Sequence, residues 1–304
     1  MKFFDLHCDT IGECYKGNKK LYENDLHISL RRASHYENYT QVFAVWIPDE
    51  LRGAEALTYF DNVTDYFYKE LNANKNIISS YQNKSETPIK AILAAEGGSA
   101  CGGDIDGLRH IYDRGVRVIT LTWNERNEIA GGAFSDGGFT EFGKEFVKTC
   151  EELGVIIDVS HLNRTSFFEF AELSTKPFIA SHSDCDIVDN YYGHKRNLTD
   201  EQINIIKEKK GLIGLNFCAD FLHTTDSDGY KAILAHINHL MKLGCEDVIS
   251  FGSDYDGCEM HEDLKGIEKI MCLRNYLKDN GLSDELLEKF FYSNAQCFFA
   301  NLIK

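Results

Sequence analysis

The amino-acid sequence predicts an α/β protein built as a TIM-like (β/α)8 barrel. A short apolar or β-branched run, followed by a longer amphipathic stretch, recurs eight times along the 304 residues. No glycine-rich turn of the dinucleotide-binding type follows the first run, which disfavours an open doubly wound sheet. Only three prolines occur and no Gly/Ser-rich linker interrupts the chain, so we expect residues 1–304 to form one domain.

The eight apolar runs are the predicted strands, and the amphipathic stretches between them are the predicted helices. The runs cover residues 3–7, 41–47, 89–96, 117–123, 154–161, 177–183, 211–217 and 248–254. Residues 54–74, 139–153 and 231–243 repeat apolar side chains at helical spacing. Thr199 and Gln202 form a capping-box pattern, which predicts the start of a further helix that ends at Gly211.

The composition is that of an ordinary globular protein and excludes two kinds of partner. Apolar residues make up 43% and charged residues 26% of the chain, enough to bury a sizeable core. The formal net charge of -16 would repel a phosphate backbone, so we expect no nucleic-acid partner. No apolar segment reaches the length of a signal-peptide core or of a membrane helix. We therefore expect a cytoplasmic protein without membrane association.

The ten cysteines are expected to be reduced thiols, mostly small core residues. They are scattered from Cys8 to Cys297 and contain no C-x-x-C pair. A disulfide framework belongs to an oxidising compartment, and the sequence shows no export signal.

Side chains that can bind a metal stand at the ends of five of the eight predicted strands. Because the carboxyl ends of all strands in a parallel barrel lie on one face, these side chains should converge on one pocket. They are His7 and Asp9 at the end of the first run, Glu96 at the end of the third, His161 at the fifth, His182 at the sixth and Asp254 at the eighth.

The number of donors predicts two metal ions rather than one. A lone His-x-Asp pattern such as His7 and Asp9 is weak evidence, because most histidines bind no metal. Together with His161, His182 and Glu96 it makes five donors, too many for one tetrahedral zinc with an open position. A carboxylate that bridges two ions solves this count, and Glu96 is the candidate bridge. We expect two divalent ions per chain, taken to be zinc, although the sequence does not fix the identity of the ion.

A pair of divalent ions predicts hydrolytic chemistry. Such a pair lowers the pKa of a shared water to give a bridging hydroxide, and it polarises the carbonyl that the hydroxide attacks. Asp254 is placed to hold this hydroxide and to carry its proton to the leaving amine. The alternative for Asp254 is a structural one, the capping of a turn in the Asp-Tyr-Asp-Gly sequence.

At these residues the sequence resembles the renal (membrane) dipeptidase family, peptidase family M19, within the metal-dependent amidohydrolase superfamily. The similar segments extend over nearly the whole chain and are residues 5–10, 95–98, 114–122, 158–161, 181–183, 196–197 and 236–257. The resemblance implies that His7 and Asp9 bind one zinc and that His161 and His182 bind the second. It also implies that Glu96 bridges the two ions. Glu96 and Asp254 are the predicted catalytic carboxylates, and Asp254 is also expected to contact the substrate.

The resemblance further implies contacts with the substrate. Arg196 falls where the family holds the terminal carboxylate, a role suited to the guanidinium fork. Without the family, Arg196 would be interpreted as a solvated loop arginine. The family histidine that polarises the scissile carbonyl is replaced by Trp123, so Asn124 or Asn127 is the candidate hydrogen-bond donor. Cys218 stands where some members carry a tyrosine that contacts the substrate.

The predicted function is a zinc-dependent dipeptidase, and the resemblance implies tolerance for a D-residue at the carboxyl side. The alternative is a metal-dependent hydrolase of another small amide, such as a β-lactam or a cyclic amide. A non-catalytic metal-binding protein is disfavoured because all five ligands and Asp254 are present. No lysine ends the run 117–123, which argues against a carbamylated-lysine bridge. His236 and His239 are expected to be structural or to support the site, and a homodimer is left open.

Overall fold

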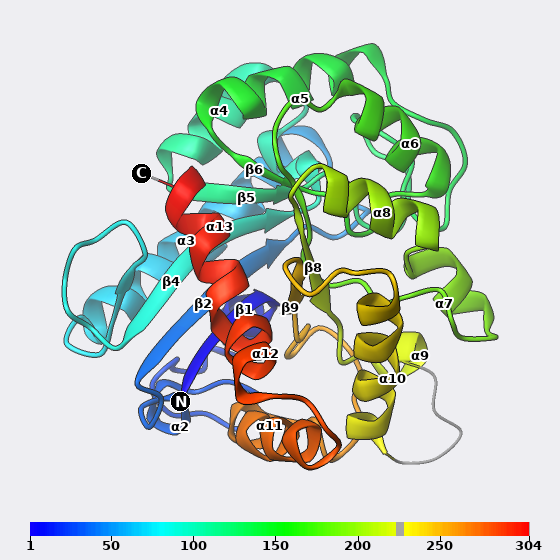
Figure 1. Ribbon diagram of the computed structural model, residues 1–304. Helices are drawn as coiled ribbons and strands as arrows, with labels where there is room; N and C mark the ends of the chain where they lie inside the picture. The colour runs from blue at the N-terminus through cyan, green and yellow to red at the C-terminus, as the bar shows by residue number, and fades with distance from the viewer. Residues whose placement is uncertain (223–227, 304) are drawn as a thin grey trace.

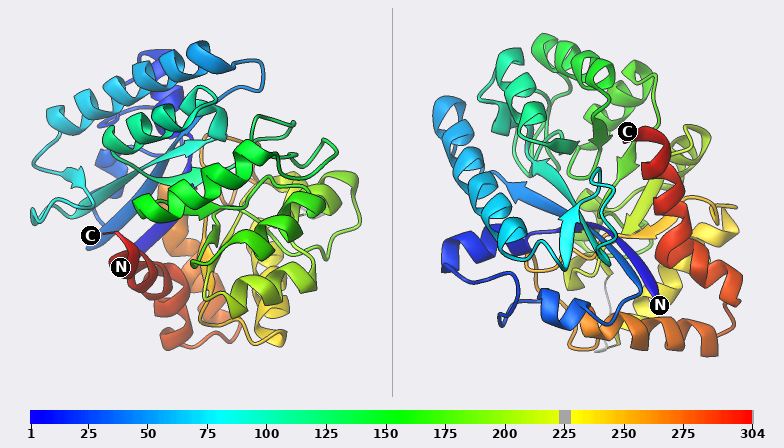
Figure 2. Two further views of the ribbon diagram at one scale, coloured as in Figure 1. Left: turned by 90° about the horizontal axis from the view of Figure 1, so that it is seen from above. Right: turned by 90° about the vertical axis from the view of Figure 1, so that its left-hand side faces the viewer.

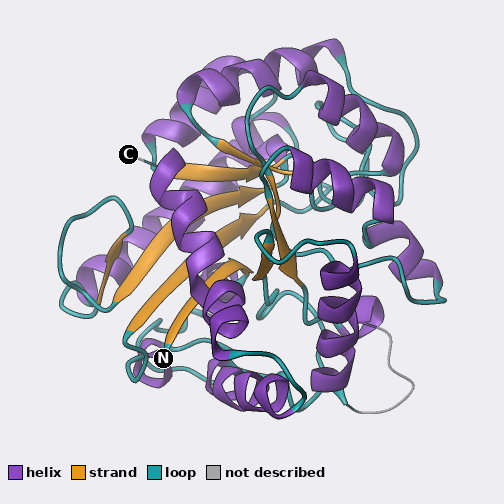
Figure 3. Ribbon diagram, in the orientation of Figure 1, coloured by secondary structure: helices purple, strands orange, loops and turns teal. Residues whose placement is uncertain are grey.

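The computed structural model describes residues 1–222 and 228–303, and its centre is a closed barrel of eight parallel strands (Figures 1 and 3). The strands follow one another around the barrel in chain order, and it closes where the last strand pairs with the first. The described strands are β1 Lys2–Cys8, β2 Asn38–Trp46, β3 Ile78–Ser80, β4 Ile89–Glu96, β5 Val116–Thr120, β6 Ile156–Asp158, β7 Ile179–Ala180, β8 Leu212–Leu215 and β9 Ile249–Phe251. This confirms the predicted fold class.

Each of the eight predicted runs overlaps one barrel strand, and two details differ. Strand β3 was not predicted, because it has three residues and only pairs with the first residues of β4. The later strands are also shorter than predicted, since β6, β7 and β9 stop before the metal-capable residues that follow them. The backbone leaves the strand geometry there, as the positive φ angles of His161 (68°) and Asp254 (60°) show.

Helices surround the strands on the outside of the barrel, as the two further views in Figure 2 show. The described helices are α1 Thr10–Gly17, α2 Leu30–Ala33, α3 Gly53–Ala73, α4 Ile105–Asp113, α5 Glu141–Leu153, α6 Arg164–Leu173, α7 Tyr191–Arg196, α8 Asp200–Glu208, α9 Ala219–Leu222, α10 Gly229–Lys242, α11 Ile270–Asp279, α12 Asp284–Glu288 and α13 Asn294–Leu302. Two 3-10 turns, η1 Gly98–Cys101 and η2 Ile267–Lys269, and a π-helical segment, η3 Lys289–Ser293, complete the set. No helix in the described ranges is long and apolar enough to cross a membrane.

The predicted helices agree with α3, α5 and α10 to within two residues at each end. The predicted capping box is also present, since the Thr199 hydroxyl accepts from the Gln202 N–H and the Gln202 side chain accepts from the Thr199 N–H. The predicted end of this helix at Gly211 is wrong. Helix α8 ends at Glu208, and Lys210 takes the left-handed conformation at φ 57°.

The barrel interior is an apolar cluster that α13 covers. Alternate residues of the strands belong to this cluster, as the two-residue period of a strand requires. Its buried members are Phe4, Leu6, Val42, Ala44, Ile92, Ala94, Val118, Ile156, Ile179 and Leu212 from the strands and Ala295, Phe299 and Ile303 from the C-terminal segment. A larger cluster packs the outer strand faces against the helices. The carboxyl ends of the strands remain for the site.

Candidate metal centre

The predicted metal ligands come together at the carboxyl ends of the strands. His7 lies near the end of β1 and Asp9 directly precedes α1. Glu96 is the last residue of β4. It follows Ile92 and Ala94 at the two-residue spacing of a strand and faces the barrel interior as they do. His161 and His182 lie in the segments that follow β6 and β7. The parallel barrel therefore brings together residues that lie up to 175 positions apart in the sequence. They are His7, Asp9, Glu96, His161 and His182.

Glu96 stands between two groups of donors and directs one oxygen to each. Its Oε2 lies 3.5 Å from Nε2 of His7. Its Oε1 lies 3.1 Å from Nε2 of His161 and 3.4 Å from Nε2 of His182. Glu96 is buried, with 3% of its surface exposed. This is the arrangement that a bridging carboxylate needs.

The donors around His7 form the first group. Nε2 of His7 lies 3.3 Å from Oδ2 of Asp9 and 3.8 Å from Oδ1 of Asp254. None of these contacts has the geometry of a hydrogen bond, so Nε2 of His7 is buried without a partner among the described groups. A buried nitrogen without a partner costs free energy unless a ligand satisfies it.

The donors around His182 form the second group, and their hydrogen bonds fix which ring nitrogen is free. Nδ1 of His182 lies 2.7 Å from the Ser181 hydroxyl, which donates its own hydrogen to Asp158 at 2.6 Å. Nδ1 of His182 must therefore carry the proton. Nδ1 of His161 lies 3.0 Å from Oδ1 of Asn124. Because an amide oxygen only accepts, Nδ1 of His161 also carries its proton. Both Nε2 atoms are then unprotonated, and they lie 2.9 Å apart.

Two imidazole lone pairs facing one carboxylate oxygen repel each other unless a cation lies between them, and this arrangement fits a metal ion. Burial lowers the pKa of His161 to about 3 and also lowers the pKa of His182, so both rings stay neutral, as metal ligands must. Burial and the charge of Glu96 raise the pKa of Asp9 to about 7. The cluster thus concentrates negative charge and free lone pairs that divalent ions would neutralise.

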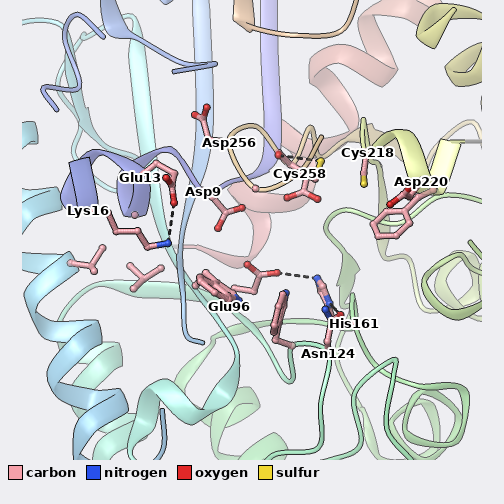
Figure 4. A pocket seen from close by; sticks show the side chains of 18 of the residues that line it. Asp9, Glu13, Lys16, Glu96, Asn124, His161, Cys218, Asp220, Asp256 and Cys258 are labelled. Atoms are coloured by element: carbon pink, nitrogen blue, oxygen red, sulfur yellow. Dashed lines mark hydrogen bonds and ion pairs between the residues drawn. The ribbon is translucent and has the colours of Figure 1, made fainter. Parts of the chain in front are cut away.

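A cavity of about 330 Å³ opens beside these residues (Figure 4). Asp9, Glu96, His161 and Asp254 all line it, so the donor cluster is accessible to a small molecule. This volume lies at the lower end of the range typical of small-ligand sites.

Comparisons with known proteins assign the chain to a family. A family model described as membrane dipeptidase, peptidase family M19, matches residues 1–301. The chain belongs to peptidase family M19. This membership confirms the predicted enzyme class, a metallo-dipeptidase.

The chain is also similar to a curated protein and to solved structures. An uncharacterised Klebsiella pneumoniae protein from the pqqA 5' region is 31% identical over 222 residues, which cover 69% of this chain and 81% of that protein. A metallo peptidase from Rhodobacter sphaeroides, solved with a phosphinate mimic of L-Ala-D-Ala, superimposes with a TM-score of 0.91 at 22% identity and 99% coverage of both chains. The dipeptidase AC of family M19 gives 0.90 at 23% identity, covering 99% of this chain and 98% of that chain. At these identities the solved structures support the fold alone.

Asp254 lies in this M19 site with its side chain free of the turn that follows it. Oδ2 accepts a hydrogen bond from the Asn216 amide at 3.0 Å, and Oδ1 faces His7. The turn is closed instead by the backbone, since the Gly257 N–H donates to the Asp254 carbonyl. A Cβ at Gly257 would lie 2.2 Å from Oδ2 of Asp9 and 2.5 Å from Oδ1 of Asp254. A side chain at position 257 would therefore have to displace these carboxylates.

Arg196 is buried rather than solvated. Its side chain ends α7, is 4% exposed and lies 5.1 Å above the ring of Phe221, a cavity residue. It donates one long hydrogen bond, 3.4 Å, to the His182 carbonyl, and its Nε has no partner among the described groups. A buried guanidinium with free donors is costly unless an anion meets it. The solvated-loop alternative is thereby excluded.

The structure gives specific places to the residues that depart from the family pattern. Asn124 lines the cavity, with its oxygen held at His161. Asn127 is not a cavity residue, because its amide donates to the Leu121 carbonyl and its oxygen accepts from two loop N–H groups. Trp123 lines the cavity 4.9 Å from the Trp46 ring, and Cys218 lines it as well.

His236 and His239 lie away from the ligand cluster, as expected. His236 accepts from the Cys185 N–H at 3.1 Å, and His239 contacts Asp200 at 2.6 Å.

Two buried aspartates that the sequence analysis did not single out position site residues. Asp5 of β1 accepts from the N–H and hydroxyl of Ser253, directly before Asp254, at 2.8 and 2.6 Å. Asp158 of β6 accepts from the N–H and hydroxyl of Ser181, directly before His182, at 2.8 and 2.6 Å. The same Asp–Ser link thus joins two pairs of neighbouring strands. Its sequence signal is an aspartate that lies within or ends a strand and follows buried apolar residues.

Proposed function

We propose that this protein is a zinc-dependent dipeptidase that cleaves the peptide bond of dipeptides, including those with a D-residue at the carboxyl side. The observation that carries the proposal is the position of Glu96, with one oxygen towards His7 and the other towards His161 and His182. Family membership supports the reaction class. Three imidazoles with carboxylates are a donor set that suits zinc.

In this proposal His7 and Asp9 would hold one ion, His161 and His182 would hold the other, and Glu96 would be a ligand of both. When bound, two divalent ions lower the pKa of water and polarise the carbonyl of the substrate. Asn124 and Ser181 keep the two ring nitrogens of the second group free for this purpose.

Asp254 is the group that moves the proton. It faces His7 across the cluster and accepts a hydrogen bond from Asn216, which keeps Oδ2 in place and leaves Oδ1 towards the cavity. A carboxylate so placed can take a proton from the attacking water and give it to the leaving amine.

Arg196 supplies the recognition of the substrate's terminal carboxylate. Its free donors and its burial favour an anionic partner beside Phe221, which lines the cavity, although Arg196 itself is not among the described lining residues. The Rhodobacter sphaeroides neighbour was solved with a mimic of L-Ala-D-Ala, which supports testing L,D-dipeptides. The ten cysteines form no disulfide, which supports a reducing, cytoplasmic setting.

The test compares a good dipeptide with its C-terminal amide in the zinc-loaded protein and in Arg196→Ala. A charge-assisted contact contributes roughly 1.5 to 3 kcal/mol, so Arg196→Ala should lower kcat/KM for the free acid strongly and for the amide very little. Lys195→Ala on the same helix is the matched control.

Three results would count against parts of the proposal. Equal losses for both substrates would mean that Arg196 acts through structure alone. Activity restricted to amides without a carboxylate would favour the β-lactam or cyclic-amide alternative. No cleavage of any L,L or L,D dipeptide by the zinc-loaded protein would overturn the function itself.

A further inference from the structure

The cavity has two ends with the donor cluster between them. In Figure 4, Lys16 and Glu13 lie on one side of Asp9 and Glu96, and Cys218 and Asp220 lie on the other. The two ends differ in chemistry.

The end that contains Cys218 and Asp220 is the one next to Arg196. Phe221 follows Asp220 in α9 and carries the Arg196 guanidinium above its ring. If the terminal carboxylate of a dipeptide meets Arg196, the scissile carbonyl lies at the donor cluster. The N-terminal residue must then extend to the opposite end, where Lys16 lies.

Lys16 brings the positive charge to that opposite end. Among the described residues that line the cavity, it is the only lysine or arginine. Its ammonium lies 3.0 Å from Oε1 of Glu13 and 4.8 Å from the centre of the Trp46 ring. An ammonium has three N–H donors, and Glu13 is the only hydrogen-bond acceptor that the described residues offer it.

A second donor without an acceptor lies beside Lys16. The indole Nε1 of Trp46 is buried and has no hydrogen-bond partner among the described groups. Trp46 also lines the cavity. The Lys16–Glu13 pair is partly exposed, with side chains 42% and 38% accessible, and such pairs contribute little stability. The pair can therefore open or share its ammonium at small cost.

We infer that Lys16 and Trp46 form a subsite for an acidic side chain on the N-terminal residue of the substrate. The inference rests on the proposed dipeptidase function and extends it to substrate class. A carboxylate supplies a negative charge and acceptor oxygens for the N–H donors of Lys16 that Glu13 leaves free, while Trp46 contributes the ring face beside the ammonium. A lysine side chain would instead meet the ammonium of Lys16 and be repelled.

The test measures kcat/KM of the zinc-loaded protein for L-Glu-L-Ala and L-Gln-L-Ala, which have nearly the same shape and differ in charge. The wild type should favour the Glu substrate about two- to fivefold, the ratio expected of an ion pair with a partly exposed ammonium. Lys16→Met should bring this preference close to one. The wild type should also have a higher kcat/KM for L-Glu-L-Ala than for L-Lys-L-Ala. Lys16→Glu should reverse this order.

Two further variants separate this role from others. Lys19→Met, two residues beyond the end of the same helix, removes a lysine that pairs with Asp25 at 2.6 Å outside the cavity, and it should keep the wild-type preference. Glu13→Gln removes the competing carboxylate and should raise the preference for the Glu substrate. If Glu13→Gln instead lowers cleavage of all dipeptides alike, Glu13 binds the substrate amine and the inference is wrong.

The failure of this inference is distinguishable from the failure of the proposed function. Cleavage of both peptides at equal rates by wild type and Lys16→Met would overturn the subsite and leave the dipeptidase intact. No cleavage of any dipeptide would overturn both.

Discussion

At the scale of the residue, the site depends on which atom of each side chain remains free. Glu96 uses its two oxygens for different partners, and His182 uses Nδ1 for Ser181 and thereby leaves Nε2 for the cluster. His7 has no described hydrogen-bond partner for Nε2 at all. Each of these atoms is buried, so the arrangement is costly without cations.

Glu96→Ala should remove both metal ions, because the carboxylate contacts both groups of donors. We expect the metal content of the purified protein, measured by plasma mass spectrometry, to fall from about two ions per chain to well below one. Glu128→Ala is the control, since Glu128 accepts from the Ser99 hydroxyl outside the cavity. An experimental structure with Glu96 more than about 4 Å from both metals would rule out the bridge, because a zinc–oxygen bond is about 2.0 to 2.2 Å.

Asp254→Asn should keep the metals and lower kcat by about two orders of magnitude or more, as expected for loss of a general acid or base. The amide keeps the size of the side chain and its contact with Asn216, so the turn after β9 should persist. Parallel measurements of metal content and of kcat test this. Turnover close to that of the wild type would return Asp254 to a purely structural role.

The metal-capable residues could be predicted from the sequence because each follows a recognisable apolar run. His7, Glu96 and His182 needed only the rule that parallel strands end on one face. The burial of Arg196 could not be predicted, because it depends on how α7 packs beside α9. The hydrogen bond from Nδ1 of His161 to the Asn124 oxygen was likewise hidden, since 37 residues separate the two.

At the scale of the element, neighbouring strands are joined by Asp–Ser links that also orient the site. Asp158 of β6 holds Ser181 after β7, and Ser181 accepts from Nδ1 of His182. The orientation of the ring is therefore set by a strand that does not contain it.

Ser181→Ala should lower zinc affinity about 10- to 100-fold, the usual effect of losing a hydrogen bond that orients a metal ligand. Competition with a chromogenic chelator measures this. Thr120→Val is the matched control, because the Thr120 hydroxyl donates to the same Asp158 oxygen at 2.6 Å without contacting a histidine. If both variants lose affinity equally, Asp158 rather than Ser181 carries the effect.

His236 on α10 should make folding sensitive to acid. Burial lowers its pKa from 6.5 to about 4, and its Nδ1 accepts from the Cys185 N–H, so the folded protein keeps the ring neutral. The unfolded chain binds a proton near pH 6.5. The stability from this group is thus fully present above pH 6.5 and is lost as the pH falls towards 4.

The measurement is the free energy of unfolding by urea at pH 7 and at pH 4.5 in wild type and His236→Gln. The wild type should lose up to about 3 kcal/mol more than the variant over this interval. His239→Gln, a change on the same helix, should behave as the wild type does. An identical pH dependence in wild type and His236→Gln would contradict the prediction.

The helices and strands could mostly be predicted from the spacing of apolar residues and from capping and turn residues. Their boundaries could be predicted less well. Helix α8 begins at Asp200 because Thr199 and Gln202 cap it, which is local information. Strand β3 could not be found, because it is stabilised by pairing with β4 rather than by a pattern of its own. The early ends of β6 and β9 reflect the positive φ angles at the site.

At the scale of the whole molecule, the barrel places stability and chemistry at different positions along its strands. The apolar interior cluster includes early strand residues such as Phe4 and Ile92 together with Phe299 of α13. The donor cluster lies at or beyond the strand ends, at Glu96 and the residues after β6, β7 and β9. A change within the interior cluster should therefore affect folding more than metal binding.

Phe299→Ala tests this separation. The ring is fully buried and lies 4.9 Å from the ring of Phe4, which begins the interior cluster. Truncating a buried phenylalanine costs about 3 to 5 kcal/mol, because apolar contacts are lost and a cavity remains. The urea midpoint should fall accordingly, with the slope of the transition unchanged. Metal content and kcat in the absence of urea should stay close to those of the wild type.

Cys297→Ala on the same helix is the control, because Cys297 is exposed and should change stability by less than about 0.5 kcal/mol. The separation would be contradicted if Phe299→Ala, measured well below its urea midpoint, lost metal or turnover in proportion to its loss of stability. In that case α13 would act on the donor cluster through the strands, for example through β1, whose Phe4 and His7 lie three positions apart. A stable variant with unchanged midpoint would instead mean that α13 can detach from the barrel without unfolding it.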